Sequence, residues 1–344
     1  MTKLDIAFLE RFTNEIGPVG KSLGMLIRPT FIAAPGKTLV WGDWSAIEAR
    51  VLPWLAASPG AEKVLDIFRQ NDSDPDLPDI YELTAGELLG IEAAEVSKQQ
   101  RQSHGKVPVL SLGFGGGVGA LQKMAVNYKV YFDEQAAKSL VESWRARNQW
   151  APDFWGRFHV DRHGNVDQSS GLWGAVNSAL RNPGTAYAAG RVAYVFDESY
   201  MGGTLFCALP CGRLLTYPDC RLRTRQVKDK DTGDESEKTA IWYRKGYGWG
   251  AFWHGRAAEN VTQAVAGSVL RETLVMLDKH YADFMPVIGH VHDEIVTEVD
   301  ERPDLVEKAE AALKEAMEAK PEWRATLPLT AEVTEWNYYT KALG

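Results

Sequence analysis

Cysteine is nearly absent from this chain. Only Cys207, Cys211 and Cys220 occur among 344 residues, and no two of them have the C-x-x-C spacing of a zinc ligand pair. So few thiols exclude a disulfide-stabilised scaffold and argue against structural zinc. Long apolar runs are missing as well, and the N-terminus Met1-Thr-Lys-Leu-Asp lacks a signal-peptide pattern. We therefore expect no membrane partner and a cytoplasmic location.

Basic residues are also fewer than acidic residues. The chain has 38 Lys and Arg against 46 Asp and Glu, a formal net charge of -8, which argues mildly against a nucleic-acid partner. Local distribution matters more, however. Arg221, Arg223 and Arg225 alternate along one expected strand face and could reach a DNA backbone. We expect the polar segment 226–238 that follows to form an exposed hairpin.

The ordinary composition that remains, 45% hydrophobic and 24% charged, fits a globular protein of about two domains. Its most informative stretch is 286–299, where strand-like alternation stands on both sides of His292-Asp293. A β-hairpin would hold Asp293 at its tip. Two interpretations are about equally supported by this stretch alone: Asp293 is a turn former, or it is a rigidly held metal ligand.

A second acidic stretch favours the metal ligand. An apolar strand, Thr38 to Trp41, runs into Asp43, and a helical pattern of apolar residues begins at Ile47. Asp43 therefore lies at a strand end, a rigid position that suits a carboxylate ligand.

These two stretches resemble motifs A and C of the family A DNA polymerases, the group of bacterial DNA polymerase I and many phage replicases. Between them, Arg101-Gln-Ser-His-Gly-Lys-Val-Pro-Val-Leu-Ser-Leu-Gly-Phe-Gly-Gly-Gly117 resembles motif B, the nucleotide-binding helix of that family. Three motifs in the family's order, spread over most of the chain, make a specific signal.

The resemblance implies an α+β fold with right-hand polymerase architecture. We expect a first part of an antiparallel-sheet palm at 1–52, mostly helical fingers at 53–205 with the motif B helix at about 105–117, and the second part of the palm at 206–344. The family's thumb and exonuclease domains are not recognisable in this chain. We therefore expect either a minimal palm and fingers or a separate polypeptide that supplies thumb and 3′–5′ exonuclease.

The same resemblance implies the metal chemistry. Asp43 and Asp293, with the backbone carbonyl of Trp44, would hold two Mg²⁺ ions, for which Mn²⁺ is expected to substitute. Glu294 is expected to tune this site without touching the metal. Two acids so close would repel each other unless cations lie between them.

Motif B implies the nucleotide site. Lys106, Leu110 and Phe114 are spaced four and four, so one helix face can present all three. Pro108 fits only a first helical turn, which would put Lys106 at a helix start, where phosphate binds favourably. The family's usual Arg four positions before the lysine is replaced by Gln102, with Arg101 one position further back.

Other residues of the expected nucleotide and DNA sites are assigned by resemblance. Glu48 matches the family's acid that blocks a ribose 2′ hydroxyl, whereas Leu110 replaces an aromatic residue and Phe114 lacks a tyrosine hydroxyl. A helix expected at about 255–280 presents Arg256, Asn260 and Gln263 on one face, where they would follow the DNA minor groove. His292 is expected to contact DNA beside them.

The sequence thus predicts a template-directed DNA polymerase core whose partners are primer-template DNA and dNTPs. If the chain is phage-encoded, its location would be the host cytoplasm. Two alternatives stay open. A single-subunit RNA polymerase shares the acids, although Glu48 argues against it, and a non-catalytic DNA-binding replication subunit would carry a vestigial site.

Overall fold

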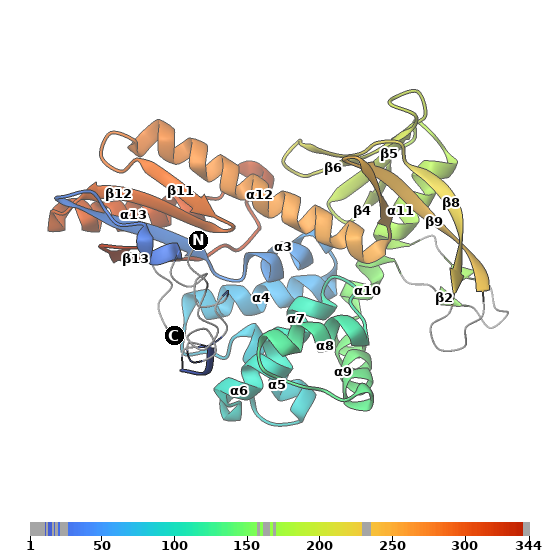
Figure 1. The fold of residues 1–344 in the computed structure, drawn as a ribbon, viewed down its shortest axis with the longest axis horizontal. Helices are drawn as coiled ribbons and strands as arrows, with labels where there is room; N and C mark the ends of the chain where they lie inside the picture. The colour runs from blue at the N-terminus through green and yellow to red at the C-terminus, as the bar shows by residue number, and fades with distance from the viewer. Residues whose placement is uncertain are drawn as a thin grey trace. The chain divides into compact units, whose positions relative to one another are not determined.

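The computed structural model describes residues 27–339 apart from 157–158, 161–165, 168–169 and 229–234, together with a few scattered positions before residue 27. The chain divides into two compact units, whose helices and strands are labelled in Figure 1. Unit 1 contains residues 1–45, 269–319 and 329–344, and unit 2 contains 46–268 and 320–328. Helices and antiparallel sheets both contribute, which confirms the predicted α+β class.

Unit 1 is built on a four-stranded antiparallel sheet. Its strands, in the spatial order β11-β12-β1-β13, are β11 (Val287–Val291), β12 (Glu294–Asp300), β1 (Lys37–Trp44) and β13 (Ala331–Trp336). A short 3₁₀ turn, η1 (Arg28–Thr30), precedes β1. The hairpin predicted at 286–299 and the strand end predicted at Asp43 are therefore both present.

One face of this sheet is covered by α13 (Pro303–Glu318), whose buried side chains recur every three to four residues (Figure 1). The end of β1 is tied closely to the end of this helix. Gly42 faces Met317 so closely that a Cβ at residue 42 would overlap the Met317 sulfur. Next to it, the Trp44 indole N–H donates a hydrogen bond to the Met317 carbonyl at 2.9 Å. These contacts fix the strand segment that carries Asp43.

The opposite face of the sheet has its own apolar cluster, formed by Leu39, Trp41, Val296 and Tyr339. The rings of Trp41 and Tyr339 meet edge to face at 5.6 Å. Side chains alternate between faces along a strand, so Asp43 shares this second face with Trp41 rather than the face under α13.

Unit 2 contains most of the helices. The unit includes α3 (Ile47–Ala56), α4 (Pro59–Ser73), α5 (Ile80–Leu89), α8 (Val118–Asn127), α9 (Glu134–Arg147), α10 (Trp150–Trp155), α11 (Gly171–Arg181) and η4 (Glu322–Arg324). Side chains of Ser58, Asp79 and Asp133 accept backbone N–H groups at the starts of α4, α5 and α9.

The motif B segment differs from its prediction. Instead of one helix at 105–117, the chain forms η2 (Ala93–Glu95), then a helical run made of α6 (Lys98–Gln100), the π-helical turn η3 (Arg101–Lys106) and α7 (Val107–Leu112). Lys106 is the N-cap of α7 and Pro108 lies in the first turn of α7, as predicted, but the π-helical turn continues the run before Lys106, so this helix start is not a free one. Phe114 lies beyond the end of α7. The π-helical turn, in which the Val107 N–H bonds to the Gln102 carbonyl, gives the chain an alternative to the tight α turn that Pro108 disfavours.

The remainder of unit 2 is largely sheet, so the helical character predicted for 53–205 ends before residue 187. One sheet has the order β4-β5-β6-β7 and a second the order β10-β9-β8, and β2 pairs with β3. The strands are β2 (His159–Val160), β3 (Val166–Asp167), β4 (Tyr187–Ala189), β5 (Val192–Asp197), β6 (Thr204–Ala208), β7 (Leu214–Tyr217), β8 (Arg221–Lys228), β9 (Glu235–Lys245) and β10 (Gly248–Phe252). The predicted hairpin at 226–238 is present as β8 and β9, although its tip lies outside the described residues.

The long helix predicted at 255–280 is α12 (His254–Tyr281), whose residues up to Ser268 belong to unit 2. The unit borders at 45/46 and 268/269 differ from the domain borders predicted at 52/53 and 205/206. As a division into palm and fingers, the predicted borders stay predictions. Among the described helices, none has the length and apolar character needed to cross a bilayer.

Candidate functional site

Sheet register brings the two predicted metal-binding acids together in unit 1. Asp43 on β1 lies directly opposite Glu294 on β12, and Asp293 is the residue before Glu294. Opposed residues have Cα atoms about 5 Å apart and consecutive residues about 3.8 Å, so the Cα atoms of Asp43 and Asp293 lie within roughly 9 Å. Asp293 occupies the tight turn after His292, whose φ of 55° is left-handed. The carboxylates thus stand on rigid elements rather than on a long loop.

Glu294 is buried and has a charged partner that the sequence did not predict. Its side chain is 2% exposed, and both of its oxygens accept from the Arg28 guanidinium, at 3.0 and 2.8 Å. Arg28 also lies over the Tyr339 ring at 5.0 Å. A buried carboxylate with such a partner is held in place. Because Glu294 opposes Asp43 in the register, this ion pair supports the backbone under both predicted metal ligands.

The donor set fits a hard divalent cation. Asp43 and Asp293 offer carboxylate oxygens, and Trp44, the residue after Asp43, offers a backbone carbonyl. Within the described part of the chain, no group of three or more His, Cys, Asp or Glu side chains is arranged to hold a metal by itself. A cation here would therefore take its remaining ligands from water or a substrate, as Mg²⁺ does in phosphoryl-transfer sites.

Lys106 lies in unit 2 between two tyrosines. Its Nζ is 6.0 Å from the ring centres of both Tyr81, on α5, and Tyr128, after α8. Burial raises the pKa of Tyr81 to about 12. Burial, and then the charge of Glu48, raises the pKa of Tyr128. Both phenols stay neutral at physiological pH, so the rings beside the Lys106 Nζ carry hydroxyl groups and not phenolates.

The π-helical turn places Arg101, five positions before Lys106, on the helix face of Lys106. In an i to i+5 turn, the residue five positions earlier takes the place on the helix face that an α-helix gives to the residue four positions earlier. Arg101 and Lys106 accordingly contact the same Tyr81 ring, Arg101 at 5.0 Å. Arg101 also forms an ion pair with Asp79, the N-cap of α5. Gln102, at the family's usual position, has a buried side-chain oxygen instead.

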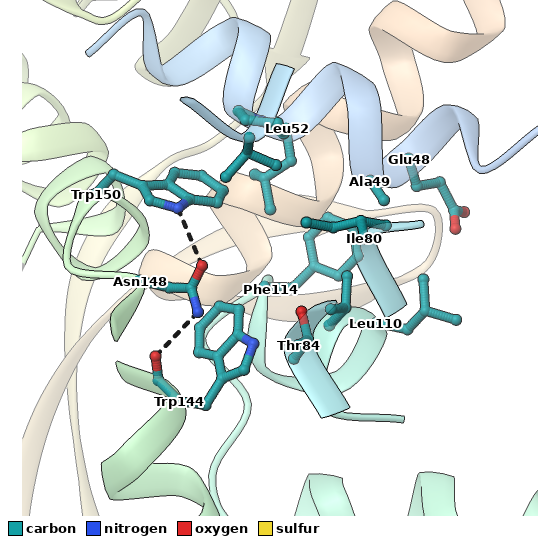
Figure 2. A pocket seen from close by; sticks show the side chains of 14 residues that line it. Glu48, Ala49, Leu52, Ile80, Thr84, Leu110, Phe114, Trp144, Asn148 and Trp150 are labelled. Atoms are coloured by element: carbon teal, nitrogen blue, oxygen red, sulfur yellow. Dashed lines mark hydrogen bonds between the residues drawn. The ribbon is translucent and has the colours of Figure 1, made fainter. Parts of the chain in front are cut away.

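Glu48, Leu110 and Phe114 line one small pocket in unit 2 (Figure 2). Trp144, Asn148 and Trp150 form the wall away from Glu48, and Asn148 accepts from the Trp150 indole at 3.3 Å and donates to the Trp144 carbonyl at 3.1 Å. The free volume is about 30 Å³, room for about one water molecule. A nucleobase does not fit unless Phe114 or its neighbours move.

The polar residues of α12 are tied to the same unit. The Gln263 amide donates a hydrogen bond to the Glu48 carboxylate, which brings two predicted site residues into contact. The Asn260 amide donates to the hydroxyl of buried Tyr217 at 3.1 Å. Arg256 has a buried Nε that donates to no acceptor among the described residues. Gly267 faces open space, so this part of the helix surface is accessible.

The predicted site residues therefore fall into two groups. Asp43, Trp44, His292, Asp293 and Glu294 lie in unit 1, whereas the predicted nucleotide-binding residues and the α12 stripe lie in unit 2. Sequence reasoning missed Arg28, Tyr81 and Tyr128, the partners of Glu294 and Lys106. In the sequence, Arg28 is marked only by the proline that follows it, and Tyr81 and Tyr128 are aromatic residues with no motif around them. The side chain of Arg225, which was expected to reach a DNA backbone together with Arg221 and Arg223, lies outside the part of the chain that the structure describes.

Sequence comparison relates this chain to known proteins. Over 329 residues the chain is 32% identical to the DNA polymerase of Bacillus phage SP02, an alignment that covers 94% of this chain and 44% of that protein. This chain is a relative of the polymerase I group of DNA polymerases. DNA polymerase I of Rhizobium leguminosarum is 24% identical over 331 residues, 93% of this chain and 25% of the relative. The chain thus spans less than half the length of these relatives. No family model matches it.

Structure comparison agrees on the fold. The POL domain of Pol1 from M. smegmatis, solved in complex with DNA primer-template and dNTP, superposes with a TM-score of 0.55 at 17% identity, covering 93% of this chain and 43% of that one. This likeness confirms the predicted right-hand polymerase fold.

Proposed function

We propose that this chain is a template-directed DNA polymerase core that adds deoxynucleotides to a primer 3′ end. The observation that carries the proposal is the pairing of Asp43 opposite Glu294, which gathers two distant acids at one sheet end. The relatives support it, since they are DNA polymerases and the superposed domain was solved with primer-template and dNTP. Primer-template DNA and dNTPs are the substrates we propose for this chain.

Asp43 and Asp293, with the Trp44 carbonyl, would hold two divalent cations, Mg²⁺ or Mn²⁺, which neutralise charge on the attacking and leaving oxygens when bound. The chain's own residues do the rest. Lys106 and Arg101 offer positive charge to the triphosphate from one helix face, the lysine as a point charge and the arginine as a planar fork. For Arg101 to do so, the bound triphosphate must compete with Asp79.

Glu48 is the residue we propose to select the sugar. Its carboxylate is held by Gln263 at the edge of the pocket that Leu110 and Phe114 line. A fixed carboxylate there rejects a 2′ hydroxyl by occupying its space. Leu110 is not aromatic, so no ring at this position helps to exclude the hydroxyl. Discrimination between dNTP and rNTP should therefore depend mainly on Glu48.

Replacing Glu48 with alanine should therefore lower the ratio of dNTP to rNTP incorporation, on the order of 100-fold. Single-nucleotide primer extension with matched dNTP and rNTP measures this ratio. Glu87→Ala, an exposed acid on α5, is the control and should leave it unchanged. An unchanged ratio in Glu48→Ala would remove Glu48 from sugar selection, and a wild-type preference for rNTPs would favour the RNA polymerase alternative.

Breaking the Arg28–Glu294 pair should destabilise unit 1. Arg28→Met leaves the buried Glu294 carboxylate without its cation, which we expect to cost about 3 kcal/mol of unfolding free energy. Urea denaturation measures the loss. The double variant Arg28→Met/Glu294→Gln removes both charges and should recover at least half of it. Equal stability of the single and double variants would show that the pair contributes no coupling.

Two further points are proposals as well: that the chain is catalytic rather than a non-catalytic replication subunit, and that a separate polypeptide completes it. Binding of primer-template without turnover under any metal would support a non-catalytic replication subunit instead. A separate polypeptide carrying thumb or 3′–5′ exonuclease would reveal itself by a rise in processivity on addition to the chain, and high processivity of the chain alone would make it unnecessary.

A further inference from the structure

One surface of unit 2 gathers three arginines around a single tryptophan. The guanidinium carbons of Arg221, Arg223 and Arg244 lie 4.8, 4.5 and 4.7 Å from the ring centre of Trp249. We name these four residues the arginine–tryptophan cluster. The three arginines are exposed and Trp249 is half-buried. The cluster contains none of the residues assigned above to metal, nucleotide or primer contacts.

The strand register places all four side chains on one face of the sheet β10-β9-β8. Trp249 on β10 pairs with Arg244 on β9, Arg221 on β8 pairs with Trp242, and residues two apart share a face. The alternate residues Ile241, Tyr243 and Phe252 are buried on the other face. The cluster therefore forms the outer, solvent-facing surface of this sheet.

The chemistry of the cluster selects its ligand. Guanidinium groups that contact the indole leave their N–H groups at the edge, so the surface offers hydrogen-bond donors rather than a bare aromatic face. Asp219 pairs with Arg221 at 2.6 Å, which leaves two of the three positive charges without a compensating ion pair among the described residues. Such a concentration of donors in a chain of net charge -8 is complementary to a row of phosphates.

An exposed aromatic ring adjoins the cluster. Tyr247 lies in the turn between β9 and β10, two residues before Trp249, and its side chain is fully exposed. Basic residues interleaved with an accessible ring are typical of surfaces that follow single-stranded nucleic acid, since the arginines hold the backbone and the ring stacks on a base.

We propose that the arginine–tryptophan cluster binds the unpaired template strand ahead of the primer end, through its phosphates. The inference rests on the proposed polymerase function and adds a second nucleic-acid contact to it. All three guanidiniums lie within about 5 Å of one ring, so they are at most roughly 10 Å apart, a spacing that follows one backbone rather than bridging the ~12 Å major groove of a duplex.

This contact is separate from the minor-groove contact expected for α12. Tyr217, which accepts the hydrogen bond from Asn260, packs against Tyr243 and Phe252 at 5.1 and 4.8 Å, on the buried side of the same sheet. The cluster lies on the outer side, so the sheet stands between it and Asn260. Loss of the cluster should therefore leave primer-duplex binding unaffected.

The test is the affinity of the full chain for labelled primer-templates, measured by fluorescence anisotropy without nucleotide. Three substrates share one primer duplex: a template overhang of 2 nucleotides, one of 20, and the 20-nucleotide overhang made double-stranded. The variant Arg221→Gln/Arg223→Gln/Arg244→Gln removes the three charges. Lys63→Gln/Lys138→Gln/Lys320→Gln removes three exposed charges from elsewhere in unit 2 and is the matched control.

We expect the cluster variant to bind the 20-nucleotide overhang roughly tenfold more weakly and to lower the salt dependence, d log K/d log[salt], by about 2. Its affinity for the 2-nucleotide overhang should stay within twofold of wild type, and the control should match wild type throughout. Because binding is measured without nucleotide, this test is independent of whether the chain polymerises. Nucleotide addition on the 2-nucleotide overhang should persist in the cluster variant.

Three results would overturn the proposal: no loss on the long overhang, an equal loss on the 2-nucleotide overhang, or a loss confined to the double-stranded substrate. Circular dichroism checks that the variant folds. If the triple Arg→Gln variant does not fold, two milder variants test the proposal in its place: Arg223→Gln alone, and Arg221→Lys/Arg223→Lys/Arg244→Lys. The first should lower the salt dependence by about 0.7, and the second should retain it, because lysine keeps the charge that phosphates sense.

Discussion

Replacing Asp43 or Asp293 with asparagine is expected to lower kcat for primer extension by roughly 10³-fold or more, because each change removes a negative ligand from the site proposed to hold the cations. Asparagine keeps the side-chain size, so the fold should persist. Quenched-flow measurement of single-nucleotide addition gives kcat, and a Mg²⁺ titration should show a raised half-saturation concentration in any residual activity.

The matched control is Asp300→Asn, an exposed acid at the other end of β12, which should retain wild-type kcat and Mg²⁺ dependence. Thermal unfolding should show all three variants within a few degrees of wild type, or higher for the two site variants, since removing one of two close carboxylates relieves repulsion in the absence of metal. Undiminished extension by Asp43→Asn or Asp293→Asn would end the polymerase proposal.

The second large effect, a loss of kcat/KM for dNTP, is expected when Lys106 is replaced. Its ammonium group lies 6.0 Å from the ring centres of Tyr81 and Tyr128, on the face it shares with Arg101. Lys106→Ala should lower kcat/KM for dNTP by about 100-fold, since a charged contact with the triphosphate is lost. Steady-state single-nucleotide kinetics at saturating primer-template measures the loss.

Lys98→Ala, which removes an exposed lysine from the start of the same helical run, should leave kcat/KM unchanged. Inhibition by inorganic tripolyphosphate separates charge recognition from helix damage: its inhibition constant should rise in Lys106→Ala and recover in large part in Lys106→Arg. A wild-type KM for dNTP in Lys106→Ala would remove this residue from the nucleotide site.

The parts that were predictable from sequence are those with a strict local period. Alternation around His292-Asp293 and before Asp43 predicted the hairpin and the strand end, and the register then had little freedom, because a slip by one residue would turn the apolar side chains of β12 to the wrong face. The long helix α12 was predicted within one residue for the same reason. The amide side chains of Asn260 and Gln263 lie on one side of the helix, and the buried Val261 and Val265 lie on another.

The parts that were missed depend on tertiary contacts. Arg28 is linked to Glu294 across 266 positions, and neither residue has a neighbour in sequence that signals the other. The apolar run Val192–Asp197 does not distinguish strand from buried helix by pattern alone, so it was assigned with the helices around it. In motif B, counting by 3.6 residues per turn assumed a regular helix, and Pro108 then appeared to require a free helix start at Lys106.

The π-helical turn at 101–106 has the geometry of a helix that contains one extra residue. A helix that gains a residue must either rotate everything beyond it by about 100° or absorb the extra residue locally, and the bulge does the latter. Gly105 lets this turn pack closely against α5, since any side chain at 105 would collide with the Tyr81 carbonyl. Deleting Gln102 should restore the four-residue interval between arginine and lysine without disturbing either end. Motif B would thereby tolerate a change in length that a simple alignment would score as the loss of its arginine.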